Sequence, residues 1–302
     1  METNQIGQVR SFNRAVTRRV GALDASYLSR GRPLGEARLL FEIGMAGSAG
    51  LQSLRERLGL DSGYLSRLLR KLERDGLVEI GRDDGDGRAR LARLTATGEA
   101  EYAAYERLSD DLASEILRSL NEAQRERLVR AMAEVERLLR AGSVSVGLEA
   151  ADSADARACL EQYYVELARR FPAGFDPLAG SNFDPAEMSP PKGWFVVARL
   201  EGAPIGCGAL KTLEPGVGEV KRVWTSGEAR GLGVASRVMD RLEQLAAEAG
   251  FKLVRVDTNG ALKEAQAMYA ARGYRSIARY NDNPYAEHWF EKRVAPRPLE
   301  IR

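Results

Sequence analysis

Apolar residues recur at helical spacing through most of the first 140 residues. Ile6–Ser29 places its apolar side chains three and four residues apart, which predicts one long helix that ends at Arg30–Pro33. Further helices are predicted over Gly35–Met45, Gly50–Leu58, Ser62–Asp75, Thr97–Leu120 and Asn121–Arg140. Leu77–Ile80 and Ala89–Leu94 are typical of two short strands, joined by a polar, glycine-rich hairpin over 81–88. This part therefore predicts a mainly α domain over residues 1–141.

The pattern changes after Ala141–Ser145, a small and weakly patterned stretch that is the best linker candidate. Strand and helix patterns then alternate, which predicts a mixed α/β domain over residues 145–296. The expected strands are Val144–Leu148, Trp194–Leu200, Pro204–Leu213, Glu219–Ser226, Phe251–Asp257, Tyr274–Tyr280 and His288–Val294. The expected helices are Ser153–Phe171, Val234–Ala249 and Leu262–Arg272.

Composition narrows the class of protein. The chain has 302 residues, of which 44% are apolar and 29% charged, so it can build packed cores and is not a disordered protein. The formal net charge of +2 gives no global field for nucleic acid, so any such site must be local. No apolar run approaches the ~18 residues that span a bilayer, and the chain is expected in the cytoplasm. Cys159 and Cys207 both lie in apolar patterns and are expected as buried free thiols.

The candidate chemistry centres on Arg230–Ala235, which lies between the strand Glu219–Ser226 and the helix Val234–Ala249. A helix N-terminus offers free backbone N–H groups and the positive end of the helix dipole, and glycines let an anion approach the backbone. The expected ligand is a phosphate, and specifically a pyrophosphate. The six residues lack the Lys-Ser/Thr of a P-loop and the G-x-G-x-x-G spacing of a dinucleotide fold.

Two motifs resemble the GNAT family of N-acetyltransferases. The first is the R-x-x-G-x-A form of Arg230–Ala235, preceded by Glu219–Trp224. The second is Ala265–Tyr269 followed by Arg272–Tyr274, an A-x-x-x-Y-x-x-x-G-aromatic pattern. The resemblance covers 145–294 and implies an acyl-CoA N-acyltransferase fold that uses acetyl-CoA as donor, an amine as acceptor, and no metal.

The resemblance also implies roles for single residues. The main-chain amides of the loop would bind the coenzyme A pyrophosphate, and the preceding strand would bind the pantetheine arm through its backbone. The coenzyme-binding set is Val223, Trp224, Arg230, Gly231, Leu232, Gly233, Val234, Ala235 and Asn259. Acyl transfer from a thioester needs the ammonium deprotonated and the leaving thiolate protonated. The resemblance implies that Glu219 is the general base; the alternative is a solvated carboxylate at the edge of a strand. It implies that Tyr269 is the general acid; the alternative is a side chain whose ring only packs against the sheet.

The acceptor is less well specified by the sequence. The proline-bearing loop Pro172–Lys192 and the irregular Tyr280–Tyr285 are the expected walls of its pocket, since recognition loops are often long. Asp282 or Glu287 could attract a cationic amine, or could be solvated acids. The single histidine, His288, is expected to pack within a strand rather than to act as a base.

The N-terminal half has the spacing of a helix-turn-helix. One helix ends near Gly59, a turn follows, and a second helix begins at about Ser62 with Leu65, Leu68, Leu69 and Leu72 facing the core. Donor-rich side chains near the start of such a helix suit the major groove, and arginines in the following hairpin suit phosphates or a minor groove. The predicted DNA-binding residues are Ser62, Tyr64, Ser66, Arg67, Arg70, Arg82, Arg88 and Arg90.

This half resembles the MarR family of winged-helix regulators. The resemblance rests on Leu68–Val78, the hairpin Arg82–Arg88 and Leu94–Gly98, and it covers residues 5–140. It implies a homodimer, formed through the first and last helices, that binds pseudo-palindromic double-stranded DNA. The leading interpretation is a transcription regulator fused to an N-acetyltransferase. A regulator whose second domain only senses acetyl-CoA and an enzyme whose winged helix only dimerises remain alternatives.

Overall fold

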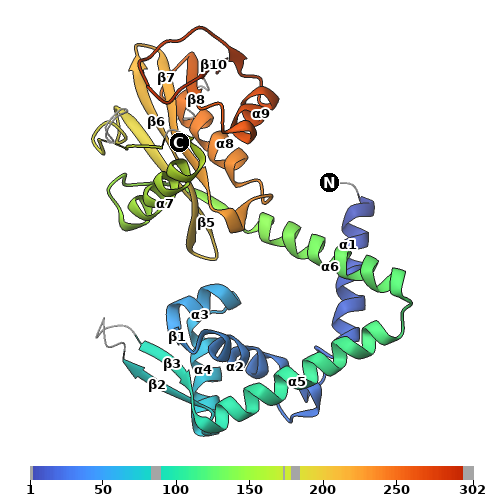
Figure 1. The fold of residues 1–302 in the computed structure, drawn as a ribbon. Coiled ribbons are helices and arrows are strands. Elements are labelled where there is room, and N and C mark those ends of the chain that lie inside the picture. The colour runs from blue at the N-terminus through green and yellow to red at the C-terminus, as the bar shows by residue number, and fades with distance from the viewer. Residues whose placement is uncertain (1–2, 83–89, 173, 178–183, 295–302) are drawn as a thin grey trace. The chain divides into compact units, whose positions relative to one another are not determined.

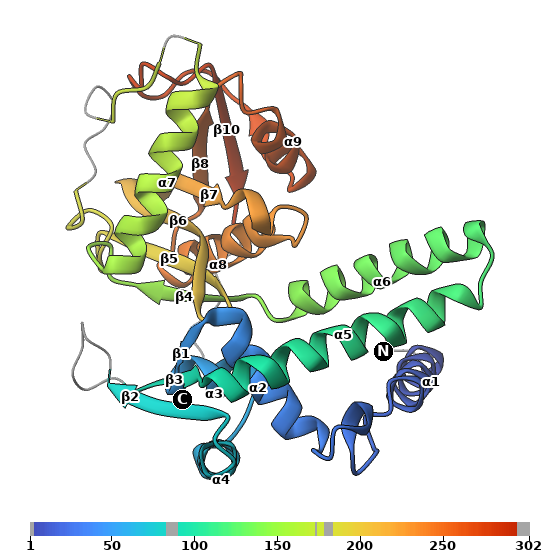
Figure 2. The ribbon, with the colours of Figure 1, turned by 60° about the horizontal axis from the view of Figure 1, so that its bottom comes forward.

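The computed structural model describes residues 3–82, 90–172, 174–177 and 184–294. The chain divides into two compact units, Met1–Met132 and Ala133–Arg302. The predicted domain boundary at 141–145 lies at the end of a helix, α6, whereas the two units divide within that helix. Each unit is described by itself (Figures 1 and 2).

The N-terminal unit is mainly helical and carries a small antiparallel sheet in the order β1-β3-β2. Its core is built from buried side chains of α2, α3, α4, the sheet and α5. The elements are α1 (Thr3–Arg19), a 3-10 turn (Tyr27–Ser29), α2 (Leu34–Ala46), β1 (Ser48–Gly50), α3 (Leu51–Leu58), α4 (Ser62–Arg74), β2 (Val78–Arg82), β3 (Arg90–Leu94), α5 (Ala96–Arg118) and α6 (Glu122–Gly142).

The helix-turn-helix prediction is confirmed in its local detail. Leu65, Leu68, Leu69 and Leu72 are buried on one face of α4, as their spacing predicted. The Asp61 carboxylate accepts the Tyr64 amide at 2.8 Å and caps the helix. The mainly α fold with a winged hairpin therefore follows from the apolar pattern.

The first helix is shorter than predicted. α1 ends at Arg19, and the chain then turns at Gly21, where φ is +64°. The Gly21 and Ala22 amides donate to the carbonyls of Arg18 and Thr17, which closes the helix end. The apolar residues beyond this point do not continue one helical face, and Leu23 is 86% exposed. The prediction of one helix over Ile6–Ser29 was therefore wrong in its second half.

The C-terminal unit is a mixed sheet with helices on both faces. Its described strands form one sheet in the order β4-β5-β6-β7-β8-β10-β9, and only the β7–β8 pairing is parallel. The elements are β4 (Ser145–Glu149), α7 (Ala154–Arg170), β5 (Gly193–Leu200), β6 (Ala203–Glu214), β7 (Val217–Thr225), a 3-10 turn (Gly227–Ala229), α8 (Val234–Glu248), β8 (Leu253–Thr258), α9 (Lys263–Ala271), β9 (Arg275–Ser276) and β10 (His288–Arg293).

Two apolar clusters cover the opposite faces of this sheet. Val196 and Ala198 of β5 pack with α8 and α9, whereas Phe195 and Val197 of the same strand pack with α7. This alternation is the expected result of a period of two along a strand. Figures 1 and 2 show α7 and α8 on the two sides of the sheet. Cys159 and Cys207 are buried free thiols in the α7-side cluster, as predicted.

Strand β9 is much shorter than the predicted strand Tyr274–Tyr280. It pairs with β10 at Arg275 and Ser276, and the Ile277 amide still donates to the Trp289 carbonyl at 2.9 Å before the described pairing ends. The Tyr280 hydroxyl and the Asn281 amide each donate to Glu219 at 3.0 Å. These side-chain contacts, rather than a backbone ladder, hold this segment against β7.

Strand β7 has two irregularities that shape the site. Its parallel pairing with β8 runs from Val217 to Val220 and ends there, although β7 continues to Thr225. A bulge against β6 places Arg222 at φ +59°, and its carbonyl accepts the Cys207 thiol at 3.4 Å. A bulge changes the direction in which a side chain points. Lys221 and Arg222, although consecutive, consequently line the same cavity.

Candidate functional site

The larger cavity lies at the N-terminus of α8 and has a volume of about 510 Å³. Gly231 and Gly233 adopt φ of +81° and +74°, a conformation that a residue with a Cβ rarely takes. The loop can therefore turn tightly into the helix, whose first N–H groups have no partner within the helix. The described lining includes Trp224, Thr225, Arg230, Gly231, Gly233, Val234, Ala235 and Ser236. Leu232 is instead buried in the core, 5% exposed.

Charged side chains lie along one wall of this cavity. Glu166 of α7 accepts the Arg230 guanidinium at 2.5 Å, Arg170 at 3.1 Å and the Trp224 indole N–H at 3.0 Å. Arg170 also pairs with Glu264, and this contact lowers the pKa of Glu264 to about 2. Glu166 thus holds Arg230 at the cavity. The sequence alone does not indicate that these two residues are partners.

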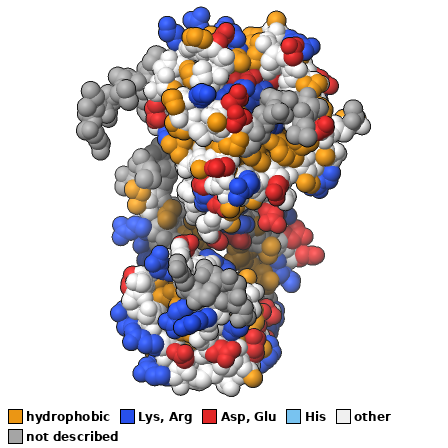
Figure 3. All heavy atoms as spheres, turned by 90° about the vertical axis from the view of Figure 1, so that its left-hand side faces the viewer, with side chains coloured by type: hydrophobic (Ala, Val, Ile, Leu, Met, Phe, Trp, Pro, Cys, Tyr) orange, Lys and Arg blue, Asp and Glu red, His pale blue; other side chains and the backbone are white. Residues whose placement is uncertain are grey.

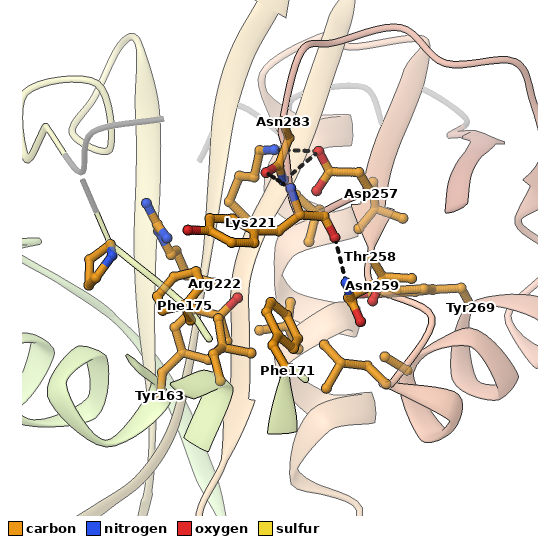
Figure 4. Close-up of a pocket in the computed structure, with 18 residues that line it drawn as sticks. Tyr163, Phe171, Phe175, Lys221, Arg222, Asp257, Thr258, Asn259, Tyr269 and Asn283 are labelled. Atoms are coloured by element: carbon orange, nitrogen blue, oxygen red, sulfur yellow. Dashed lines mark hydrogen bonds and ion pairs between the residues drawn. The ribbon is translucent and has the colours of Figure 1, made fainter. Parts of the chain in front are cut away.

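The smaller cavity, about 100 Å³, opens where β7 and β8 part (Figure 4). Aromatic side chains from α7 and two loops surround it, together with the polar ends of residues on β7 and β8. Phe175 and Pro177 of the predicted proline-bearing loop line it, as do Asn283 and Tyr285. The other labelled members include Tyr163, Phe171, Lys221, Arg222, Asp257 and Thr258.

The two cavities adjoin. Both are lined by Val223 at the β7 bulge and by Tyr269 of α9. Tyr163 of α7 also lines both. A ligand that entered the larger cavity could therefore present one end to a second ligand in the smaller one.

The phenols of Tyr269, which is buried, and Tyr163, which is half-buried, lie at this junction. Burial raises the pKa of each hydroxyl above its usual value, so both are neutral O–H donors at physiological pH. The Tyr269 ring packs on Tyr274 and Phe290, with centroids 5.7 and 5.9 Å away. The sequence motif pointed to Tyr269, whereas nothing in the pattern of α7 singled out Tyr163.

A buried charge cluster lies beside the smaller cavity. The Lys221 ammonium lies 3.0 Å from Glu219 and 2.8 Å from Asp257, and the side chains of both acids are less than a tenth exposed. The Asn281 amide bridges the same two acids. Asp257 lines the cavity (Figure 4), whereas Glu219 is not among the described lining residues. The predicted base, Glu219, therefore contacts Lys221 without lining the cavity, whereas a second carboxylate, that of Asp257, lies on the cavity wall.

Other predicted residues lie elsewhere. Asn259 lines the smaller cavity rather than the larger one, and its side chain donates to the Tyr285 carbonyl at 2.8 Å. Asp282 is fully exposed and pairs with Arg279, and Glu287 accepts the Gly260 amide at 2.8 Å. Neither acid is among the described residues that line the two cavities. His288 packs beside Phe290 on β10, with ring centroids 6.4 Å apart.

Five of the eight predicted DNA-binding side chains lie on the exposed face of α4. Ser62, Tyr64, Ser66, Arg67 and Arg70 are all exposed, and the Arg67 guanidinium lies over the Tyr64 ring at 5.5 Å. At the wing, Arg82 and Arg90 form opposed positions at the ends of β2 and β3, and Arg88 lies outside the described residues. On the face drawn in Figure 3, basic and acidic side chains are interspersed, which agrees with the small net charge.

Comparisons with known proteins give each half a family. Residues 160–274 match the acetyltransferase (GNAT) family, and residues 30–89 match the MarR family. The chain joins a MarR-family region to a GNAT-family region. An IAA acetyltransferase of Azospirillum brasilense is 36% identical over 81 residues, 26% of this chain and 53% of that protein. An uncharacterized N-acetyltransferase of Schizosaccharomyces pombe is 32% identical over 100 residues, 32% of this chain and 61% of that protein.

The matched segments thus span between half and two thirds of the length of these two relatives. Among solved structures, a GNAT acetyltransferase of Staphylococcus aureus is 14% identical, with a TM-score of 0.44, over 50% of this chain and 99% of that one. A mutant MarR of E. coli complexed with operator DNA is 25% identical, with a TM-score of 0.38, over 44% of this chain and 95% of that one.

Two kinds of feature are absent from the described residues. No helix among them is long and apolar enough to cross a bilayer. No group of three or more His, Cys, Asp or Glu side chains in the same residues is arranged to hold a metal ion.

Proposed function

We propose that the GNAT-family region transfers an acetyl group from acetyl-CoA to an amine. The observation that carries this proposal is the meeting of two cavities at Val223 and Tyr269. The larger cavity has the size and the helix N-terminus that a phosphate-bearing donor needs, and the smaller one is enclosed by aromatic and polar side chains. When bound, acetyl-CoA supplies an activated acyl group as a thioester.

The residues around the larger cavity fit coenzyme A. The loop Arg230–Ala235 contains two positive-φ glycines, Gly231 and Gly233, which carry no Cβ that would keep an anion from the backbone N–H groups. The parting of β7 from β8 after Val220 leaves the β7 backbone at Val223 and Trp224 beyond the parallel ladder. We propose that the loop binds the pyrophosphate and that this stretch of β7 binds the pantetheine arm.

The proposed proton movements involve Tyr269 at the junction and the charge cluster beside the smaller cavity. We propose that Tyr269, a buried neutral phenol, protonates the leaving sulfur. The ammonium proton of the acceptor leaves through the Glu219–Lys221–Asp257 cluster, and Asp257 is its member on the cavity wall. Glu219 then acts through Lys221 or water, because its own carboxylate does not line the cavity.

We further propose that the MarR-family region binds double-stranded DNA as a homodimer. The exposed face of α4 supports the DNA contact, together with Arg82 and Arg90 at the facing ends of β2 and β3. α1 exposes Ile6, Val9, Phe12 and Val16, and the first half of α6 exposes Val129 and Met132. Apolar faces of this kind support dimerisation through the first and last helices.

An amine screen tests the catalytic proposal. Purified full-length protein would be incubated with acetyl-CoA and amino acids, polyamines, aminoglycosides or peptides while free thiol is measured. The expected result is thiol release that depends on one class of amine and an acetylated product of matching mass. Tight acetyl-CoA binding without turnover on any amine would refute catalysis and support the sensor alternative.

The DNA proposal needs its own test. Selection of bound duplexes from a randomised library should enrich a pseudo-palindromic sequence. The same selection with an Arg67→Ala variant should enrich it less. A library that shows no enrichment with the wild-type protein would contradict operator binding and leave the region as a dimerisation module.

A further inference from the structure

The end of α6 is packed against the GNAT-family region rather than hanging from it. Ala141, in the last turn, contacts the apolar core of that region, and Val144 just beyond it is 6% exposed within the same core. The Val144 carbonyl accepts the Arg237 guanidinium of α8 at 3.0 Å. The residues between α6 and β4 are therefore an ordered junction, and the orientation of the last turns of α6 is fixed relative to α8.

Arg137, one turn earlier in α6, contacts the loop at the larger cavity. Its guanidinium donates from Nη1 to the Gly231 carbonyl at 2.6 Å. The other two nitrogens, Nε and Nη2, donate to the Glu134 carboxylate at 2.9 and 2.6 Å. A bidentate pair of this kind favours one plane for the guanidinium, which directs Nη1 toward the Gly231 carbonyl.

The contact reaches one of the two glycines of the loop. Gly231 has φ of +81° and no Cβ, so it has wide conformational freedom unless its peptide groups are held. Its neighbours Arg230 and Gly233 line the larger cavity with it. Fixing the Gly231 carbonyl therefore restricts the loop before any anion arrives, which lowers the ordering cost of binding.

We infer that Arg137 is a positioning residue for coenzyme binding, supplied by a helix outside the matched segment 160–274. The inference rests on the proposed coenzyme site. Arg137 is not among the described residues that line the larger cavity, so it acts on the loop and not on the ligand. Because Arg137 lies in the last turns of α6 and contacts the loop within the same unit, the ordering of those turns and the occupancy of the loop are thermodynamically linked.

Calorimetric titration of acetyl-CoA into full-length variants tests the inference. Arg137→Ala should raise Kd at least about threefold, since one charge-assisted hydrogen bond that orders the loop is lost. Arg137→Lys, which can still donate to Gly231, should recover part of the loss. Arg130→Ala is the matched control, because Arg130 pairs with Glu126 on the same helix. The control should bind like the wild type, and all variants should keep the wild-type Tm.

Two further readouts separate positioning from other roles. Dephospho-coenzyme A should show the same loss in Arg137→Ala as coenzyme A does, whereas a loss confined to coenzyme A would mean direct contact with the 3′-phosphate and would overturn the positioning role. Hydrogen exchange should show acetyl-CoA protecting the backbone amides of 133–142 in the wild type and much less in Arg137→Ala. Equal protection in both proteins would contradict the linkage.

The two proposals fail in different ways. If the wild type binds acetyl-CoA and Arg137→Ala binds it equally well, this inference is wrong and the proposed function stands. If the wild type does not bind acetyl-CoA, the proposed function is wrong and the inference falls with it.

Discussion

Replacing Tyr269 by Phe removes one hydroxyl from the junction of the cavities and little else. The ring is 4% exposed and packs on Tyr274 and Phe290, so Phe should keep those contacts and the fold. A positioned general acid contributes about 10²–10⁴-fold, and thiolates need this help less than poorer leaving groups do. We therefore expect kcat to fall at least about tenfold, which is about 1.4 kcal/mol in activation free energy. The Kd for acetyl-CoA should change less than about twofold.

Steady-state thiol release and calorimetry together measure this prediction. Tyr163→Phe is the matched control, because Tyr163 is a half-buried phenol that also lines both cavities. Wild-type kcat in Tyr269→Phe would refute the acid role, and a loss only in Tyr163→Phe would transfer that role to Tyr163. Burial raises the pKa of Tyr269, and the protonated phenol is the active form. Deprotonation of Tyr269 should therefore not lower the rate until the pH exceeds about 10, the usual tyrosine value.

Other substitutions test separate parts of the account. Gly233→Glu should abolish measurable acetyl-CoA binding in calorimetry, because it adds negative charge and a strained φ at the anion loop; unchanged Kd would mean that the site is misplaced. Asp257→Asn should lower kcat/KM at least about tenfold while acetyl-CoA still binds, and an unaltered pH profile of kcat/KM would remove Asp257 from the proton path. Arg67→Ala should weaken operator binding by about 1–3 kcal/mol and weaken binding to random DNA less. Equal losses of affinity for the two DNAs in anisotropy titrations would indicate that Arg67 contacts a phosphate. Leu72 is 0% exposed, so Leu72→Ala should lower the free energy of unfolding measured in urea by about 2–5 kcal/mol. A decrease below about 1 kcal/mol would contradict the packing of α4.

Much of the fold follows from local patterns. The apolar face of α4 and its Asp61 cap, the hairpin β5–β6 and the strand-turn-helix around Arg230–Ala235 all have short-range signals that packing then reinforces. The predicted helix and strand bounds were wrong where tertiary contacts determine the local structure. The chain leaves its helix at Gly21 despite continued apolar spacing, and β9 is cut short where Tyr280 bonds to Glu219.

The candidate site was only partly predictable for a related reason. Its loop and Tyr269 have sequence motifs, but the residues around them come from distant elements. Asp257 meets Lys221 across the parting of β7 and β8, and Arg137 reaches Gly231 across 94 residues. Which side of a strand a residue faces also changes at a bulge, so Arg222 could not be placed by alternation. Such pairings depend on register and packing, which a single sequence does not specify.

A crystal structure of the full-length protein with acetyl-CoA tests the central claim most directly. The account predicts the pyrophosphate on the backbone N–H groups of Arg230–Ala235, the pantetheine arm along β7, and the thioester between Val223 and the Tyr269 hydroxyl. A pyrophosphate bound away from this loop, or a thioester that does not reach the junction of the two cavities, would contradict it.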